Sequence, residues 1–386
     1  MLNFEFKNPT KIIFGKGKIE KLSREIRKDA NILMIYGGGS IKKNGVYEQV
    51  IAALDGYKLT EFGGVPANPE YEVLLEALRV IKDKNIDYLL AVGGGSVIDG
   101  VKFLSAAANY DGEPWEILSN RVVTTEGKGM PFATVLTLPA TASEMNSGAV
   151  ISRRGTGEKL AMGGPGLFPQ FSILDPEVIR SIPKNQIANG ITDAYTHVLE
   201  QYMTYPTGAS LQDRFAESIL LSLQEVAPKV MAEAFDYDAA ANFMWSCTMA
   251  LNGLIGKGVP QDWAVHSMGH ELTAQYGIDH ARTLAIVAPQ HYHYYFDKKK
   301  DKLAQYAERV WNITEGSVDE KAKKGIEAME QFFHSLDIKT KLSEYTDSYN
   351  GTAEKVQAAF ESRGWLLGEN QMVTPEDAKK IVEMTY

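Results

Sequence analysis

Side chains that commonly bind metal ions are concentrated in the second half of the chain. In GITDAYTHVLEQY, Asp193 and His197 are four residues apart and would share one face of a helix. The segment QDWAVHSMGHELTAQYGIDHARTLAIV carries His266, His270 and His280, so three of the seven histidines fall within 15 residues. Carboxylate oxygen and imidazole nitrogen suit Zn²⁺, Fe²⁺ or Mn²⁺ without selecting among them. The spacing predicts a metal site formed by Asp193, His197 and two of the three later histidines.

The pairs Asp193/His197 and His266/His270 have an alternative explanation as solvated side chains on helix surfaces. For the remaining histidines and the cysteine, no role in metal binding is predicted. Cys247 is the only cysteine, which excludes an internal disulfide and any cysteine-ligated zinc or iron–sulfur site. Its apolar surroundings, FMWSCTMAL, predict a buried core residue. His291, His293 and His334 are predicted to occupy surface or interface positions and receive no role.

Two apolar segments in the first half each run into three glycines and a serine: ILMIYGGGS at 32–40 and YLLAVGGGS at 88–96. Glycine after a buried strand lets the backbone approach a phosphate, and a following helix N-terminus adds unpaired N–H groups. Asp99 could cap that helix or accept a hydrogen bond from a ribose or amide. Neither loop has the G-x-G-x-x-G or P-loop pattern, and a tight turn explains one isolated loop equally well. Two such loops predict similar roles at one edge of a sheet.

The first of these loops favours NADP(H) over NAD(H). Many NAD-binding proteins place an acidic residue after the second strand to bind the adenosine ribose, but this chain has Gly38, Gly39 and Ser40. Lys42 and Lys43 follow closely. Without a carboxylate to repel it, a 2′-phosphate could be bound by Ser40, backbone N–H groups and one of these lysines. Together with the metal cluster, this indicates hydride transfer from a nicotinamide, with the cation as Lewis acid.

The elements that would position these residues divide the chain in two. From residue 10 to about 175, β-rich runs (TKIIFG, NILMIY, DYLLAV, FATVLTL and FSILD) alternate with helical patterns such as 73–81 and 97–108. Such alternation predicts parallel strands joined by crossover helices. After Pro183 strand-like runs nearly vanish and helical patterns recur, as at 209–233 and 238–256. The sequence predicts an α/β, Rossmann-like nucleotide-binding domain over 1–182 and an all-helical metal-binding domain over 183–386.

Length and charge narrow the class of protein further. A chain of 386 residues favours two domains, and its net charge of −9 is spread along the sequence. That distribution disfavours nucleic acid and membrane surfaces as partners. No signal-peptide pattern and no run of about 18 apolar residues is present. We therefore expect a cytoplasmic enzyme that acts on small molecules.

These motifs, taken in order, resemble the iron-containing (group III) alcohol dehydrogenase family, and in it the branch of NADPH-dependent butanol dehydrogenases and broad aldehyde reductases. The likeness covers essentially the whole chain. It is carried by FKNPTKIIFGKG, YGGGSIKKNGVYEQV, FGGVPANPEYE, VGGGSVIDGVKF, LTLPATASEMNSGAVIS, NGITDAYTHVLEQY, LNGLIGKGVPQDWAVHSMGHELTAQYGIDHARTLAIV and AERVWNITEG. The resemblance implies a dehydroquinate synthase-like architecture and hydride transfer between NADP(H) and short- to medium-chain aldehydes or primary alcohols. It also implies an iron or zinc ion and a homodimer.

The resemblance also assigns individual residues. It implies Asp193, His197, His266 and His280 as the metal ligands, and it leaves His270 unliganded beside the nicotinamide as a candidate proton-relay group. The cofactor contacts that it implies come from the glycine loops and the threonine-rich segment, and they are Gly38, Ser40, Asn68, Gly94, Gly95, Ser96, Asp99, Thr137, Asn146 and Lys159.

Three alternatives share this architecture. A polyol or glycerol dehydrogenase would use the same parts on another substrate, and a dehydroquinate synthase should carry extra basic residues around its substrate. The NPTKIIFG start, the PATASE segment and QDWAVHSMGHEL favour the aldehyde and alcohol branch over both. A non-catalytic nucleotide-binding relative is disfavoured by the complete set of metal ligands.

Overall fold

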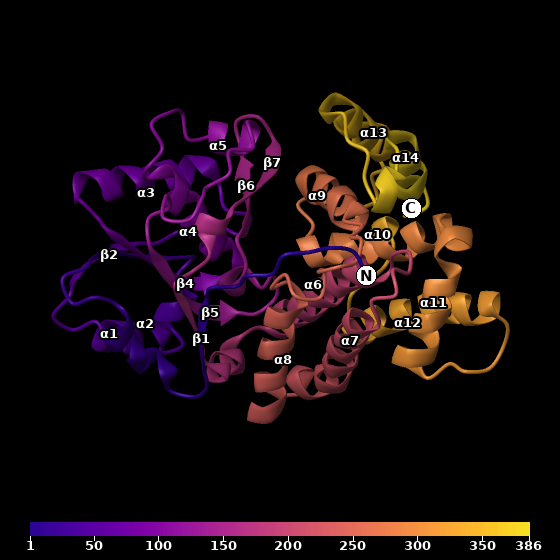
Figure 1. Ribbon diagram of the computed structural model, residues 1–386, viewed down its shortest axis with the longest axis horizontal. Coiled ribbons are helices and arrows are strands. Elements are labelled where there is room, and N and C mark those ends of the chain that lie inside the picture. Colours follow the sequence, from indigo (N-terminus) through magenta and orange to yellow (C-terminus); the bar gives the residue numbers. More distant parts are fainter. The chain divides into compact units, whose positions relative to one another are not determined.

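The computed structural model describes residues 1–386, which divide into two compact units (Figure 1). One unit comprises Lys7–Pro183 and Phe235–Asn252, and the other comprises Met1–Phe6, Lys184–Ala234 and Gly253–Tyr386. The first unit is built on a parallel sheet and the second is helical, so the predicted fold class is confirmed. The segment Phe235–Asn252 follows the change to helical sequence but belongs to the α/β unit.

Six parallel strands form the sheet, in the order β1-β8-β5-β4-β2-β3. They are β1 (Lys11–Phe14), β2 (Asn31–Tyr36), β3 (Lys58–Phe62), β4 (Tyr88–Gly94), β5 (Phe132–Leu138) and β8 (Phe171–Leu174). The inner strands β2, β4, β5 and β8 are buried almost throughout, which explains why they read as continuous apolar runs. A separate antiparallel hairpin consists of β6 (Gly148–Arg153) and β7 (Glu158–Gly163).

Helices cover both faces of the sheet. Those of this unit are α1 (Leu22–Glu25), α2 (Val46–Ala53), α3 (Tyr71–Asp83), α4 (Gly95–Ala107), α5 (Glu116–Ser119) and α8 (Tyr237–Ala250). Figure 1 shows α1 and α2 on one face, and α3 and α4 on the other. Cys247 lies buried on α8, as predicted.

The two glycine loops follow neighbouring strands of this sheet. Tyr36 at the end of β2 pairs with Val92 near the end of β4, so both loops lie at the same edge, as predicted. The chain leaves β2 towards β3 on one side and leaves β4 towards β5 on the other. In open α/β sheets, ligands bind at such a point of reversal, outside the carboxyl ends of the strands. The topology therefore places both loops where a nucleotide would bind.

The second unit is built from helices alone, apart from one isolated bridge between Leu367 and Val373. Its helices are α6 (Lys184–Tyr202), α7 (Ser210–Met231), α9 (Ala264–Tyr276), α10 (His280–Tyr294), α11 (Phe296–Trp311), α12 (Val318–Ser335), α13 (Thr352–Arg363) and α14 (Pro375–Glu383). Capping boxes start α12 at Ser317 and α14 at Thr374. From Ile187 to Tyr202 every residue of α6 is buried, and α7 and α10 pack against it. No helix in the structure combines the length and the apolar character needed to span a bilayer.

Short 3-10 helices complete the chain. They are η1 (Lys18–Lys21), η2 (Ser40–Lys42), η3 (Ser143–Met145), η4 (Pro165–Leu167), η5 (Pro176–Ser181), η6 (Leu342–Glu344) and η7 (Glu369–Gln371). The turn of η2 begins at Gly39, whose φ of 92° lies in the left-handed region that favours glycine. The left-handed conformation alone therefore explains why a glycine occupies position 39, whether or not it contacts a ligand.

Candidate metal centre and nucleotide-binding loops

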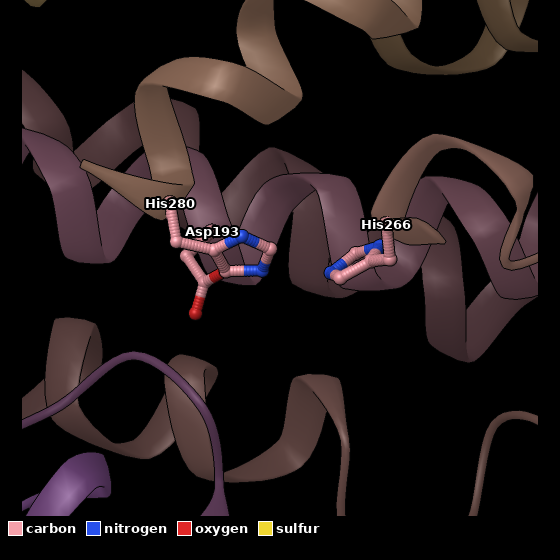
Figure 2. Close-up of side chains that lie close together, drawn as sticks. All are labelled: Asp193, His266 and His280. Carbon is pink, nitrogen blue, oxygen red and sulfur yellow. The ribbon is translucent and has the colours of Figure 1, made fainter. Parts of the chain in front are cut away.

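Three helices of the helical unit bring candidate metal ligands together. Asp193 lies on α6, His266 is the third residue of α9, and His280 is the first residue of α10. One ligand atom from each of these three side chains can be chosen so that all lie within 4.8 Å of one another (Figure 2). Asp193 and His266 are buried, whereas His280 is half-buried. The structure thus assembles a carboxylate and two imidazoles from segments separated by up to 87 positions.

His197 adds a fourth candidate ligand. Its Nδ1 lies 3.7 Å from Asp193 Oδ2, one turn earlier on α6, and its ring stacks on that of His266 with 4.6 Å between centroids. Nδ1 is buried and has no hydrogen-bond partner. Burial lowers the pKa of His197 to about 4, so the ring is neutral at pH 7, as a metal ligand must be. A neutral imidazole whose buried Nδ1 has no hydrogen-bond partner, beside a carboxylate, fits a divalent cation.

His270 occupies a different position from the other histidines. It is half-buried one turn after His266 on α9, and its ring lies 4.5 Å from that of His280. It is not among the three residues that meet at 4.8 Å. This arrangement favours His266 over His270 as a ligand, a choice that spacing alone left open.

Close packing of α9 and α10 brings His266 near His280. Gly269 faces α10, and a Cβ at this position would lie 2.9 Å from Leu284 Cδ2 and 3.1 Å from Thr283 Oγ1, so a larger residue would require side chains of α10 to shift. The start of α10 is held near α6 by Asn189, whose Nδ2 donates to Asp279 Oδ2 at 2.8 Å. Gly269 and Asn189, which are not candidate metal ligands, therefore help to place the rings of His266 and His280 near each other.

Glu200 is a buried carboxylate that contacts His266 and was not among the predicted site residues. Glu200 Oε1 accepts a hydrogen bond from Val265 N at 2.9 Å, and Oε2 accepts one from His266 N at 3.0 Å. Oε2 also hydrogen bonds with the ring Nδ1 of His266. Burial and the charge of Asp262 raise the pKa of Glu200, while His291 and the two backbone N–H groups lower it. The signal in the sequence was the spacing of Asp193, His197 and Glu200, which places all three on one face of α6.

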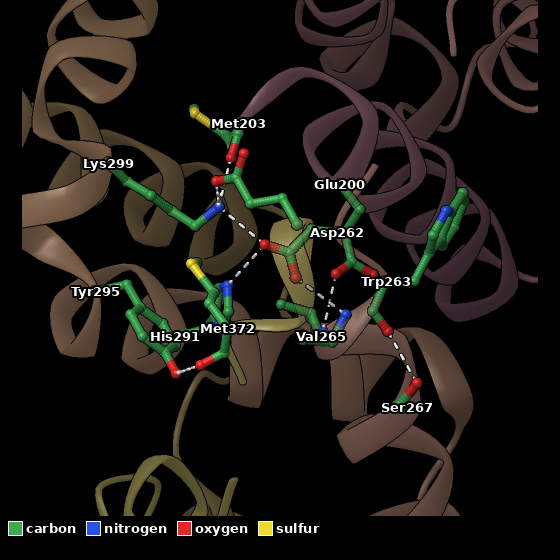
Figure 3. Close-up of polar contacts among 12 residues, drawn as sticks. Glu200, Met203, Asp262, Trp263, Val265, Ser267, His291, Tyr295, Lys299 and Met372 are labelled. Carbon is green, nitrogen blue, oxygen red and sulfur yellow. Dashed lines mark hydrogen bonds and ion pairs between the residues drawn. The ribbon is translucent and has the colours of Figure 1, made fainter. Parts of the chain in front are cut away.

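His291 corrects the prediction of a surface position. It is only 1 % exposed, and its Nε2 lies 3.3 Å from Asp262 Oδ2. The same carboxylate oxygen accepts from Lys299 Nζ at 2.8 Å, and Lys299 also donates to Glu369 (Figure 3). In the structure, α10 is covered on several sides by other helices, which buries this residue. His291 therefore belongs to a buried ionic cluster.

The glycine loops of the α/β unit combine exposed and tightly packed positions. Gly38 and Ser40 are exposed, and Gly38 has open space where a Cβ would be. Gly94 and Gly95, by contrast, pack against the segment after β5, because a Cβ on Gly94 would lie 2.9 Å from Leu138 Cβ and one on Gly95 would clash with Thr141. Ser96 is half-buried in the first turn of α4. At the carboxyl edge of the sheet, the first loop is therefore exposed, whereas the second is partly buried.

Asp99 and Asn146 are connected by a buried lysine that sequence analysis did not single out. Lys102 Nζ donates to Ser143 Oγ, Asn146 Oδ1 and the carbonyl oxygen of Gly148 at 2.7–2.8 Å. Asp99 accepts from Ser143 Oγ at 2.6 Å and from Val150 N at 2.9 Å. Burial lowers the pKa of Lys102 to about 8. Asp99 therefore fixes the threonine-rich segment onto α4 rather than capping this helix.

Other residues implied as cofactor contacts lie in the same unit. Thr137 is half-buried near the carboxyl end of β5, and Lys159 on β7 donates from Nζ to Asn68 Oδ1 at 2.9 Å. Lys42, in contrast, lies 3.4 Å from Glu61 at the end of β3 and over the rings of Tyr36 and Tyr47. Of the two lysines in the first loop, Lys42 is thus already paired with a carboxylate.

An open parallel sheet with glycine loops at its point of reversal, and a helical unit with a carboxylate–imidazole cluster, are the parts that a metal-dependent dehydrogenase needs. Family comparison agrees with this class. Residues 9–176 match the model described as iron-containing alcohol dehydrogenase, and residues 187–386 match the model for the C-terminal part of the same family. The chain belongs to the iron-containing alcohol dehydrogenase family.

Individual relatives span the same length as this chain. NADPH-dependent aldehyde reductase YqhD of Escherichia coli (strain K12) is 50% identical over 389 residues, covering 99% of each chain. Probable NADH-dependent butanol dehydrogenase 1 of Bacillus subtilis (strain 168) is 41% identical, again over 99% of each. The crystal structure of E. coli YqhD has a TM-score of 0.97 and 48% identity, covering 100% of this chain and 99% of that one. The family predicted from the motifs, and with it an alcohol dehydrogenase or aldehyde reductase, is confirmed.

Proposed function

We propose that this enzyme reduces short- to medium-chain aldehydes to primary alcohols with NADPH, and oxidises the alcohols in the reverse direction. The observation that carries the proposal is the convergence of Asp193, His266 and His280 in the helical unit of an alcohol dehydrogenase chain. The name of one relative states aldehyde reduction and that of another states butanol oxidation. The names of both relatives therefore support aldehydes and primary alcohols as the substrate class.

Each metal ligand has a role in the proposed site. Asp193, His197, His266 and His280 would hold one divalent cation, iron or zinc, which this donor set does not distinguish. Bound there, the cation supplies Lewis acidity towards a carbonyl or alkoxide oxygen. Trp263 lies 5.2 Å from the ring of His266 and 6.2 Å from that of His197, centroid to centroid.

His270 is proposed to handle the proton. Aldehyde reduction adds a hydride to carbon and a proton to oxygen, and the nicotinamide supplies the hydride. A half-buried imidazole beside His280 but outside the cluster can donate that proton from a ring nitrogen and regain it from solvent. In alcohol oxidation, the same nitrogen would accept the proton.

The preference for NADPH is supported by the first glycine loop. Relatives with the same architecture are named for NADPH in one case and NADH in another, so the family does not determine the cofactor. Exposed Gly38 and Ser40 at the end of β2 present no carboxylate to a 2′-phosphate. The other proposed contacts are Asn68, Gly94, Gly95, Ser96, Asp99, Thr137, Asn146 and Lys159, with Asp99 and Asn146 acting through the shape of their segment.

A spectrophotometric assay tests the proposed activity. Purified enzyme loaded with Fe²⁺ or Zn²⁺ should oxidise NADPH in the presence of C3–C6 aldehydes, and turnover should stop after chelation and return when metal is added back. The absence of turnover with every aldehyde in metal-loaded protein would contradict the proposal. Glycerol and other polyols form the matched panel, and faster turnover with them would favour a polyol dehydrogenase.

A further inference from the structure

Glu200 directs three hydrogen bonds onto the start of α9. It is 1 % exposed, and its carboxylate accepts from the backbone N–H group of Val265 (Figure 3). It also accepts from the backbone N–H group of His266 and contacts the ring Nδ1 of the same residue. No sequence pattern for a metal ligand includes this residue. Its contacts nevertheless converge on a single candidate ligand.

This contact selects one tautomer of His266. A neutral imidazole carries one proton, and a carboxylate beside Nδ1 holds that proton on Nδ1. The lone pair is then on Nε2, the nitrogen left to bind a cation. In known metal sites such a carboxylate orients the ring and raises its basicity, and its removal weakens metal binding by about 10- to 100-fold.

The geometry of α6 links Glu200 to the metal cluster itself. Asp193 and Glu200 are seven residues apart, about two turns, and therefore lie on the same face of this buried helix. One helix thus supplies a carboxylate to the cluster and a second carboxylate to the histidine on α9. Any rotation of α9 relative to α6 would disturb both the backbone contacts and the ring contact.

We infer that Glu200 is the positioning residue for His266, fixing the ring so that Nε2 faces Asp193 and His280. The inference rests on the proposed metal site. It adds to that site a group that touches neither metal nor substrate, and that acts only through His266.

A purely structural explanation must be separated from this one, because Glu200 also caps the first turn of α9. Glu217 offers a matched control. It lies in the same unit, is 3 % exposed, and accepts hydrogen bonds from Tyr202 and Arg309 without contacting any metal-ligand candidate. Glu200→Gln and Glu217→Gln therefore make the same side-chain change at two buried positions.

The experiment measures Co²⁺ and Zn²⁺ affinity of the full-length metal-free protein, by titration against a competing chelator, with apo-protein thermal unfolding recorded in parallel. Glu200→Gln should bind both metals about 10- to 100-fold more weakly than wild type. Glu217→Gln should keep wild-type affinity even where its melting temperature falls. Unchanged affinity in Glu200→Gln would overturn the inference.

A second pair of variants tests the route through His266. In a His266→Ala background, Glu200→Gln should cause no further loss of affinity, because the ring on which Glu200 acts is gone. If Glu200→Gln lowers metal affinity as much in the His266→Ala background as in wild type, Glu200 does not act through His266. If Glu200→Gln does not fold, Glu200→Asp, which keeps the charge but shortens the reach, should show weakened binding, and wild-type affinity would overturn the inference. Wild type that binds no metal would refute the proposed function instead.

Discussion

At the scale of single residues, the first glycine loop is the proposed determinant of cofactor preference. Gly38 and Gly39 are adjacent but not equivalent. Gly39 has a φ of 92°, which a side chain would strain, whereas Gly38 has an ordinary φ and open space around the Cβ position. Lys42 is paired with Glu61, so Ser40, Lys43 and the backbone remain to bind a 2′-phosphate. The loop thus tolerates a new charge at Gly38 without a change of backbone.

We predict that Gly38→Asp moves cofactor preference from NADPH towards NADH. Repulsion between the new carboxylate and the 2′-phosphate should raise KM for NADPH by about tenfold, equivalent to ~1.4 kcal/mol, and leave KM for NADH nearly unchanged. Steady-state kinetics with both cofactors measure the ratio. Gly38→Asn has the same size without the charge, and an equal change in that variant would remove the electrostatic explanation.

At the scale of elements, the start of α9 decides which histidine enters the cluster. Asp262 Oδ1 accepts from Ala264 N at 3.1 Å, and Glu200 accepts from the next two backbone N–H groups. Gly277, with a φ of 68°, ends the helix. These contacts fix the rotation of α9, and Gly269 fixes its distance from α10. His266 consequently faces Asp193, while His270 lies beside His280.

The two histidines of α9 should therefore respond differently to substitution. His266→Ala should lose bound metal and nearly all activity, because it removes a ligand. His270→Ala should keep about one metal per chain but turn over more slowly, with an altered pH dependence of kcat. Metal content by elemental analysis separates the two, and equal loss of metal in both variants would contradict this choice of ligands.

At the scale of the whole molecule, the candidate metal ligands and the proposed cofactor contacts belong to different units. All the metal-ligand candidates lie in the helical unit, on α6, α9 and α10, and all the proposed cofactor contacts lie in the α/β unit. A ligand that binds only the folded state adds stability in proportion to the logarithm of its free concentration. The effect of a metal should accordingly be local to one unit.

Removal of metal should destabilise the helical unit selectively. At a thousandfold excess of metal over Kd, binding contributes about 4 kcal/mol. Hydrogen exchange should therefore lose protection in α6, α9 and α10 after chelation, with little change in β2, β4 and β5. The same treatment of His266→Ala provides the control, since it has little metal to lose. Equal loss of protection in the strands would contradict a local effect.

Local patterns in the sequence were sufficient for the fold class and for much of the site. Continuous apolar runs marked the buried strands β2, β4 and β5, since both faces of a parallel sheet are covered. The spacing of Asp193 and His197 placed both on one face of α6, because helical geometry depends only on local sequence. The choice of His266 and His280 over His270 came from family resemblance, and the role of all four residues as ligands stays a prediction.

Only the tertiary structure showed which distant residues meet. His266 and His270 are four residues apart and share one face of α9, so local spacing does not separate them. The placement of the start of α9 against Glu200 and Asp262 distinguishes them. Glu200, Lys102 and His291 were missed or misplaced for the same reason. Each is a polar residue whose burial is made tolerable by a partner far away in sequence, on another helix or loop. Residue type and local period carry no information about such partners, because long-range packing creates them.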